Sequence, residues 1–225
     1  GSKSLYIHLD IPENNDIHQS KQSFSLQTTN LSGENQNTLV HYSIERLEVP
    51  SIYYHSRDMF PIPDVENFTE KEYRKNFPYL SYKDNHLPEN WKGNKILEGS
   101  LFTNDTSFLD LRKIFNKKHL GYYRITLTAK DTFNQEVTNQ HIFSLNDAES
   151  NNCTRYEPIF LDVDKTTIYI GDTLHIVYGS YLEDVVIHFE FTCNDSIIYQ
   201  EHKMINKGQI HFDFPIKKEH LGYLQ

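Results

Sequence analysis

The chain has 225 residues, with 31 acidic against 22 basic residues and a formal net charge of -9. Its Lys and Arg residues are dispersed along the sequence, whereas a surface that follows phosphates needs clustered positive charge, so nucleic acid is not expected as a partner. Alanine is almost absent while Thr, Ile, Tyr, Phe and Asn are frequent, and this composition predicts an all-β protein.

The first strand pattern lies at residues 40–44, where Val40, Tyr42 and Ile44 alternate with polar neighbours. A segment with a different composition follows, at about residues 48–94. It is rich in proline and aromatic residues and carries one helical signal. Thr69 and Glu72 form a capping box, Phe68 and Tyr73 occupy the hydrophobic-staple positions, and Pro78 prevents continuation. We therefore expect an insert with one short helix, from Glu70 towards Phe77.

Six aromatic residues of this insert are the candidate site residues: Tyr53, Tyr54, Phe60, Tyr79, Tyr82 and Trp91. Their rings have three interpretations. They pack the insert onto the domain, they form a contact surface for a neighbouring domain or partner, or they form a stacking platform for a glycan. Exposed, coplanar rings would favour the glycan, and buried rings would exclude it.

Two more alternating patterns close the first half of the chain. They comprise Tyr123, Ile125, Leu127 and Ala129, and then Val137, Phe143 and Leu145. Residues 131–135 join them and predict a hairpin with a positive φ at Asn134, because Asn tolerates that conformation second only to Gly.

A polar stretch at residues 146–155 breaks all periodicity and predicts a linker between two domains, at residues 1–148 and 149–225. In the second domain we expect strands at about 158–163, 173–178 and 184–192. Two inward rows follow from alternation: Val185, Ile187, Phe189 and Phe191, then Ile210, Phe212, Phe214 and Ile216. Cys153 and Cys193 would lie at opposite ends of this sandwich, so we expect two free thiols.

A repeated phrase supports two modules. Lys117-Lys118 precedes His119-Leu120-Gly121-Tyr122, and Lys217-Lys218 precedes His220-Leu221-Gly222-Tyr223. Two strand patterns follow the first copy and none follows the second. We therefore expect the second domain to be C-terminally incomplete, with five strands and an unpaired edge that invites pairing with another copy of the chain.

The sequence offers little for catalysis or metal binding. His188 with Glu190, and His211 with Asp213, share a strand face, but no ligand set with recognised metal spacing is present. Nucleophile elbows, phosphate loops and zincin motifs are also missing from the sequence. We predict no catalytic residue, no cofactor, no metal and no enzyme activity.

A family likeness emerges from the order of short motifs. The first domain has Asn30-Leu31-Ser32-Gly33-Glu34, Leu47-Glu48-Val49-Pro50, Pro63-Asp64, Phe77-Pro78-Tyr79, Trp91, Gly121-Tyr122-Tyr123-Arg124 and Ala129-Lys130-Asp131; the second has residues 165–174, Gly179-Ser180, Asp184-Val185 and His220-Leu221-Gly222. Together these resemble consecutive macroglobulin-like domains of bacterial alpha-2-macroglobulin family proteins, particularly those of Bacteroides and its relatives. The resemblance covers nearly the whole chain.

The resemblance implies two fibronectin III/immunoglobulin-like antiparallel β-sandwiches, seven-stranded when complete, in a long extracytoplasmic chain of the periplasm or outer membrane. Family members trap proteases, and some carry a thioester with the motif Cys-x-Glu-Gln. Neither cysteine matches, because Cys153 is followed by Thr-Arg-Tyr and Cys193 by Asn-Asp-Ser. The chain would then be a non-catalytic structural segment whose partners are neighbouring domains and, for the whole protein, a target protease. The alternative is a β-sandwich adhesion or glycan-binding module of a cell-surface protein.

Overall fold

The computed structural model describes residues 5–19, 21–56, 68–104, 107–116 and 119–222. The chain divides into two compact units, Gly1–Asp147 (unit 1) and Ala148–Gln225 (unit 2). The strands of each unit form two sheets, which confirms the predicted all-β sandwich class. Within the residues described, no helix is long and apolar enough to span a membrane.

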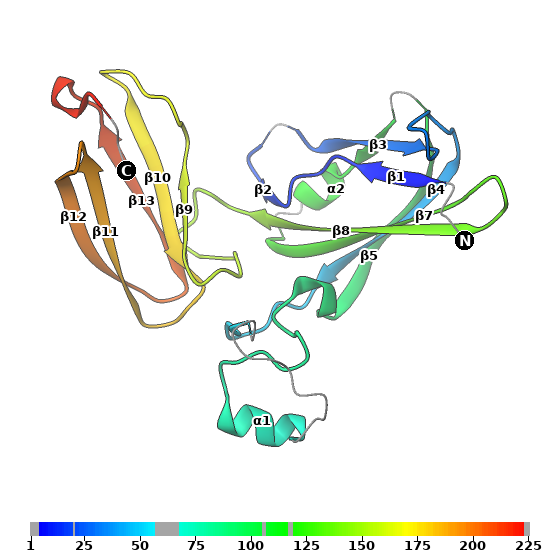
Figure 1. Ribbon diagram of the computed structural model, residues 1–225, viewed down its shortest axis with the longest axis horizontal. Coiled ribbons are helices and arrows are strands. Elements are labelled where there is room, and N and C mark those ends of the chain that lie inside the picture. The colour runs from blue at the N-terminus through cyan, green and yellow to red at the C-terminus, as the bar shows by residue number, and fades with distance from the viewer. Residues whose placement is uncertain (1–4, 20, 57–67, 105–106, 117–118, 223–225) are drawn as a thin grey trace. The chain divides into compact units, whose positions relative to one another are not determined.

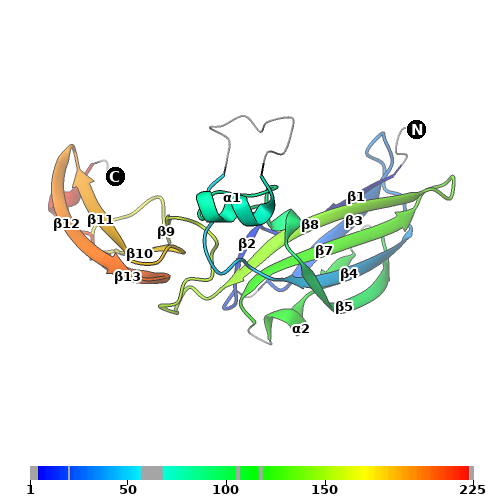
Figure 2. The ribbon, with the colours of Figure 1, turned by 90° about the horizontal axis from the view of Figure 1, so that it is seen from below.

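The two sheets of unit 1 lie one over the other (Figure 1). The smaller sheet has the order β1-β3-β6, with β1 at Tyr6–Leu9, β3 at Ser23–Thr29 and β6 at Phe108–Asp110. The larger sheet has the order β2-β8-β7-β4-β5, formed by β2 (Asn14–Asp16), β8 (Glu136–Asn146), β7 (Gly121–Lys130), β4 (Leu39–Leu47) and β5 (Gly93–Phe102). Figure 2 shows β8, β7, β4 and β5 side by side.

Alternation in β7 places one row of side chains in the core of unit 1. Tyr123, Ile125, Leu127 and Ala129 are each exposed by at most 1%. Pairing Val40 of β4 with Ala129 fixes the register, and a slip by one residue would turn the whole row to solvent. The alternating, half-buried strand predicted from Tyr123 to Ala129 is thus confirmed. The short helix α2 (Arg112–Phe115) also contributes buried Ile114 and Phe115 to this core, and the sequence patterns did not predict it.

The larger sheet departs from the antiparallel plan in one place. Unit 1 has eight strands in its described part, because β2 adds to β8 in parallel. Asn15 of β2 is buried, and its Nδ2 donates to the carbonyls of Pro12 and Ser144 at 2.7 and 3.4 Å. These hydrogen bonds hold the chain after β1 against the opposite sheet, which the resemblance did not imply.

The hairpin and the capped helix predicted in unit 1 are confirmed. Asn134 has φ 62°, and the Asp131 carboxylate accepts the backbone N–H groups of Phe133 and Gln135 within the hairpin. Helix α1 spans Glu70–Asn76 with the predicted capping box. In the staple region the Phe68 ring lies edge-on to Phe77, with ring centroids 6.3 Å apart.

Unit 2 has five strands in its described part: β9 (Phe160–Val163), β10 (Thr173–Ser180), β11 (Val185–Cys193), β12 (Ser196–Ile205) and β13 (Gly208–Pro215). One sheet has the order β13-β10-β9 and the other holds β11 and β12. The expected number of strands and an unpaired sheet edge are confirmed for these residues. The core of unit 2 contains Ile187, Phe189 and Phe191 from β11. It also contains Phe214 from β13 and Ile216, the residue just after β13.

The repeated phrase occupies the same place in both units. It follows β6 in unit 1 and β13 in unit 2, and each of these strands lies at an edge of its unit's three-stranded sheet. Gly121 has φ 126° and Gly222 has φ 137°. A residue with a Cβ atom would be strained at either position, so the glycine of the phrase has a backbone role.

Candidate functional site

The insert between β4 and β5 folds around one buried tyrosine. Tyr73 of α1 is 5% exposed, and its hydroxyl donates to the carbonyl of Ser81 at 3.1 Å. Ser81 is itself buried, and its Oγ bonds to Asn85 Oδ1 at 3.0 Å and to His86 Nδ1 at 2.7 Å. These bonds satisfy the buried hydroxyl groups of Tyr73 and Ser81, so residues 73–86 form a packed element rather than an open loop.

Most of the predicted aromatic residues pack against a neighbour. The Tyr53 ring lies edge-on to His55, the Tyr82 ring lies tilted against Tyr73, and the Trp91 ring lies edge-on to Tyr122, with centroid separations of 5.2, 5.3 and 5.0 Å. The guanidinium of Arg74 covers Tyr54 at 5.1 Å and donates to its hydroxyl.

Two of the six candidates mark the extremes of exposure. Tyr79 is 64% exposed, whereas Trp91 is 5% exposed and donates its indole N–H to Asn85 O at 3.0 Å. Phe60 lies outside the described residues. The interplanar angles among the paired rings are far from parallel, which is the geometry of packing rather than of a sugar-stacking platform. Contact with a neighbouring domain remains a prediction for these residues.

Arg124 ties the insert to the larger sheet, and no sequence motif pointed to it by itself. It lies on β7 with its side chain 13% exposed, and its Nη1 meets Glu45 of β4 at 3.1 Å. Its Nη2 donates to three carbonyls of the segment around the short 3₁₀ helix η1 (Pro88–Asn90): Pro88 at 3.2 Å, Glu89 at 2.8 Å and Trp91 at 3.0 Å. The guanidinium of this one residue therefore holds the last part of the insert against the sheet.

The two histidine–carboxylate pairs do not assemble a metal site. His188 lies 3.2 Å from Glu190, with its ring stacked on His202 at 4.1 Å, whereas His211 contacts Ser150 O and Asp213 contacts His175. Among the residues described, no group of three or more His, Cys, Asp or Glu side chains is arranged to hold an ion.

The cysteines are buried and free. Burial raises the pKa of the Cys153 thiol, and its Sγ donates to Arg155 O at 3.3 Å. A thiol with a raised pKa is a weak nucleophile at neutral pH. Cys193 is the last residue of β11, which begins at Val185.

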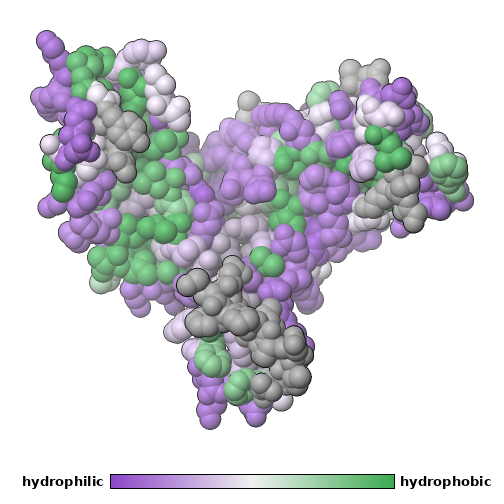
Figure 3. Space-filling view, in the orientation of Figure 1, coloured by the Kyte–Doolittle hydropathy of each residue, from purple (hydrophilic) through white to green (hydrophobic). Residues whose placement is uncertain are grey.

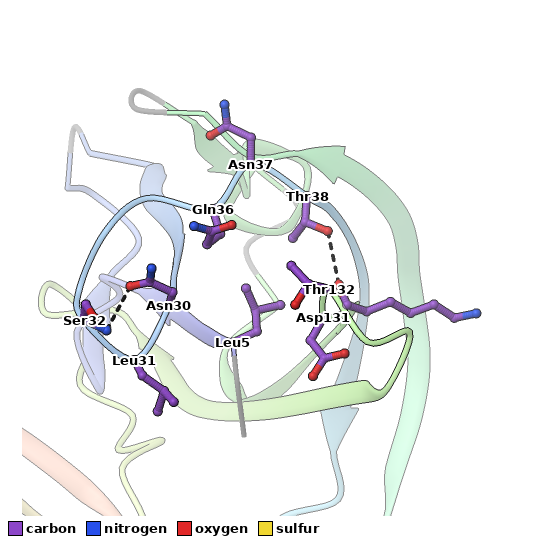
Figure 4. Close-up of a pocket in the computed structure, with 10 residues that line it drawn as sticks. Leu5, Asn30, Leu31, Ser32, Gln36, Asn37, Thr38, Asp131 and Thr132 are labelled. Atoms are coloured by element: carbon purple, nitrogen blue, oxygen red, sulfur yellow. Dashed lines mark hydrogen bonds between the residues drawn. The ribbon is translucent and has the colours of Figure 1, made fainter. Parts of the chain in front are cut away.

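A polar pocket of about 440 Å³ lies at one end of unit 1 (Figure 4). It is bounded by the turn at Asn30, the segment before β4 and the β7–β8 hairpin. Asn30 Oδ1 accepts the backbone N–H groups of Ser32 and Glu34, both at 2.9 Å, and Thr38 Oγ1 donates to Lys130 O at 3.4 Å. The side chains here thus stabilise the turn, which explains the Asn-Leu-Ser-Gly-Glu motif by local structure.

A second hollow lies in unit 2 and is more apolar. It has a volume of about 520 Å³ and is bounded by β9, β10, β11 and the segment after β13. Its walls include Leu161, Val163, Phe189 and Phe191.

No family model matches the sequence. No curated protein matches it either. Among solved structures, the chain is similar to a mutant of Salmonella alpha-2-macroglobulin, with 14% identity, 88% of this chain and 10% of that chain covered, and a TM-score of 0.29. It is likewise similar to the native conformation of E. coli alpha-2-macroglobulin, with 13% identity, coverage of 87% and 11%, and a TM-score of 0.29.

The chain spans about a tenth of the length of these two structures. Superposition this weak carries no argument about function, and the sandwich class rests on the strands and sheets of the chain itself.

Proposed function

We propose that the chain is a non-catalytic structural segment of an alpha-2-macroglobulin-like protease-trapping inhibitor of the bacterial cell envelope. The observation that carries the proposal is the repetition of one strand plan in two consecutive units. Each unit has a three-stranded sheet and a second sheet that contains an antiparallel pair of strands. This pair is β4 with β5 in unit 1 and β11 with β12 in unit 2. In both units the same phrase, with a positive-φ glycine, follows in sequence the last strand of the three-stranded sheet.

Repeated sandwiches of this kind suit a scaffold. Each has its own core, and a polar stretch joins them, so such units can be strung together to set the spacing of other domains. The assignment to this family in particular depends on the order of the sequence motifs. Its location in the periplasm or at the outer membrane belongs to the same proposal.

The geometry of the insert gives less support to the glycan-binding alternative. Its paired rings pack edge-on or tilted against neighbours, and Trp91 is buried, so the main aromatic candidate is not offered to a ligand. The insert serves better as a packed side element of unit 1.

The test uses the full reading frame that contains this chain. The purified protein is mixed with a broad-specificity protease, and we expect cleavage at one place, after which the protease retains activity on small substrates and loses it on large ones. A protein that is degraded throughout, or left uncut with the protease fully active, would refute the trap. The isolated 225-residue chain is the control. As a structural segment it should leave the activity on both substrates unchanged.

A further inference from the structure

Another hollow of unit 1, the β5–α2 pocket, lies between strand β5 and the short helix α2. It has a volume of about 420 Å³, and its walls come from β4, β5, β7, α2 and the segment between α2 and β7. All of these elements belong to unit 1, so the pocket is formed within one folded unit. Its size falls in the range of about 300–1,000 Å³ that small-molecule sites occupy in proteins.

The floor of the β5–α2 pocket is apolar. Ile114 of α2 and Tyr123 of β7 are 4% and 1% exposed and belong to the core of unit 1. Ile96 and Leu97 of β5 form a second wall, and Ile96 is 43% exposed. Hydrophilic residues predominate on the visible face of unit 1 (Figure 3). In contrast to that face, the pocket offers an apolar ligand a surface on which it is removed from water.

An irregularity in β5 explains why two consecutive residues line the pocket. Leu97 pairs with Ile44 of β4. Lys95 pairs with the next residue of β4, Glu45, so Ile96 is the extra residue of β5. Consecutive side chains of a regular strand point to opposite faces of the sheet. A bulge re-aims a side chain, and here it brings Ile96 to the same hollow as Leu97.

The rim of the pocket is positively charged. Arg46, Lys113 and His119 line it, and none of its lining residues in the described part of the chain is acidic. The whole chain has a formal net charge of -9, so this cluster is not part of a generally basic surface. Among the residues described, none of the three side chains forms an ion pair. Arg112 and, more weakly, Lys113 lower the pKa of the Asp110 carboxyl, but the ion pair of Asp110 is with Arg112, at 2.5 Å.

The guanidinium of Arg46 is held in place at this rim. Its Nη2 donates to Leu120 O at 3.1 Å, which is its one hydrogen bond among the residues described. Because a guanidinium has several N–H donors, others remain for a ligand. Burial raises the pKa of the Tyr123 hydroxyl and the charge of Arg46 opposes that rise, so this charge acts on the wall of the pocket. A guanidinium fixed in this way can bind both oxygens of a carboxylate.

We propose that the β5–α2 pocket binds a small amphipathic anion, with one carboxylate on an apolar body of about ten carbon atoms. The carboxylate would bind at the rim formed by Arg46 and Lys113, and the apolar body would cover Ile96 and Ile114. Both parts of the ligand are needed. Exposed cations alone hold an anion weakly because salt screens them, and apolar contact alone is non-directional.

Decanoate is the ligand for the test, which measures binding to the full chain by isothermal titration calorimetry. We expect saturable binding with a Kd of about 10–100 µM, an ordinary affinity for a ligand of this size. Octanoate lacks two of the CH₂ groups of decanoate and should bind about tenfold more weakly. Decan-1-ol has the same apolar body without the charge and should also bind about tenfold more weakly. Acetate, which has no apolar body, should not bind at these concentrations.

Two pairs of variants locate the site. Ile96→Glu and Ile96→Lys remove the same apolar side chain and introduce opposite charges, so we expect Ile96→Glu to bind decanoate about tenfold more weakly than Ile96→Lys. Lys113→Gln should weaken binding by about threefold or more, whereas Lys75→Gln, the same change in α1, should leave it unchanged. Because all three positions are exposed, the variants should fold.

Four results would overturn the proposal: no saturable binding of decanoate, equal affinity for decanoate and decan-1-ol, equal binding by the two Ile96 variants, or equal binding by the two lysine variants. The test does not depend on protease trapping, since it measures only the binding of a small anion by unit 1.

Discussion

Replacing Arg124 by Met should lower the free energy of unfolding of unit 1 by more than the loss of a surface ion pair does. The Arg124 side chain is 13% exposed and makes four charge-assisted contacts, one to the Glu45 carboxylate and three to carbonyls of residues 88, 89 and 91. Hydrogen bonds to a charged group contribute about 1.5–3 kcal/mol each. Glu45 is 29% exposed, so water would replace part of what is lost.

The expected net loss in the free energy of unfolding is about 3 kcal/mol, the lower end of what breaking a buried ion pair costs. Met keeps most of the aliphatic packing of Arg, so the loss reports mainly the hydrogen bonds. Trp91 is the single tryptophan of the chain and lies in the segment that Arg124 holds. Its fluorescence during urea unfolding of the full chain gives the assay.

Arg112→Met is the matched control, because its ion pair with Asp110 is exposed, at 69% and 47% for the two side chains. We expect it to cost at most about 1 kcal/mol. The reasoning is refuted if Arg124→Met costs less than about 1 kcal/mol or no more than the control. Hydrogen exchange should also quicken at residues 88–91 in Arg124→Met, and unchanged exchange there would contradict the proposed anchoring.

Three further predictions concern a close backbone approach, an alkaline transition and a helix cap. A Cβ atom at Gly179 would lie 2.6 Å from the carbonyl oxygen of Gly208. Gly179→Ala should therefore lower the free energy of unfolding of unit 2 by about 1–3 kcal/mol, measured by calorimetry. An unchanged unfolding midpoint would show that β13 can move to make room for the methyl group. Burial, then the nearby charge of Glu201, raises the pKa of Tyr178 to about 12, so the folded state favours the neutral phenol. The contribution of Tyr178 to stability is then fully present below pH 10 and is lost as the pH rises towards 12. Because Phe cannot ionise, Tyr178→Phe should unfold at a higher pH than the unchanged protein in a spectroscopic titration. The same midpoint pH in both proteins would refute this. Thr69→Ala removes the N-cap hydroxyl of α1 and should lower the local stability of the insert by about 1 kcal/mol, read as faster amide exchange in α1 and not in β7.

Much of the fold follows from local sequence patterns. Alternation over Tyr123, Ile125 and Leu127 sets which side of β7 is buried, because a strand has a period of two. The capping box defines the start of α1 because Thr69 and Glu72 satisfy backbone donors within one turn. Asn134 marks a positive φ value because few residues other than Gly tolerate that conformation. Each of these features depends on residues close together in the chain, so the sequence alone was sufficient.

Contacts between distant segments were decided by the tertiary structure alone. Three features join residues far apart in sequence: β2 pairs in parallel with β8, α2 is buried in the core, and Arg124 donates hydrogen bonds to the insert. No periodicity in the sequence encodes such pairings. The same holds for the aromatic candidates, since only the packing of Trp91 against Tyr122 separates a buried ring from an exposed one. The repeated phrase predicted an unpaired edge in unit 2. The structure identified that edge as β11 and revealed the apolar groove beside it, because which strands become neighbours depends on how the two sheets of a sandwich share their strands.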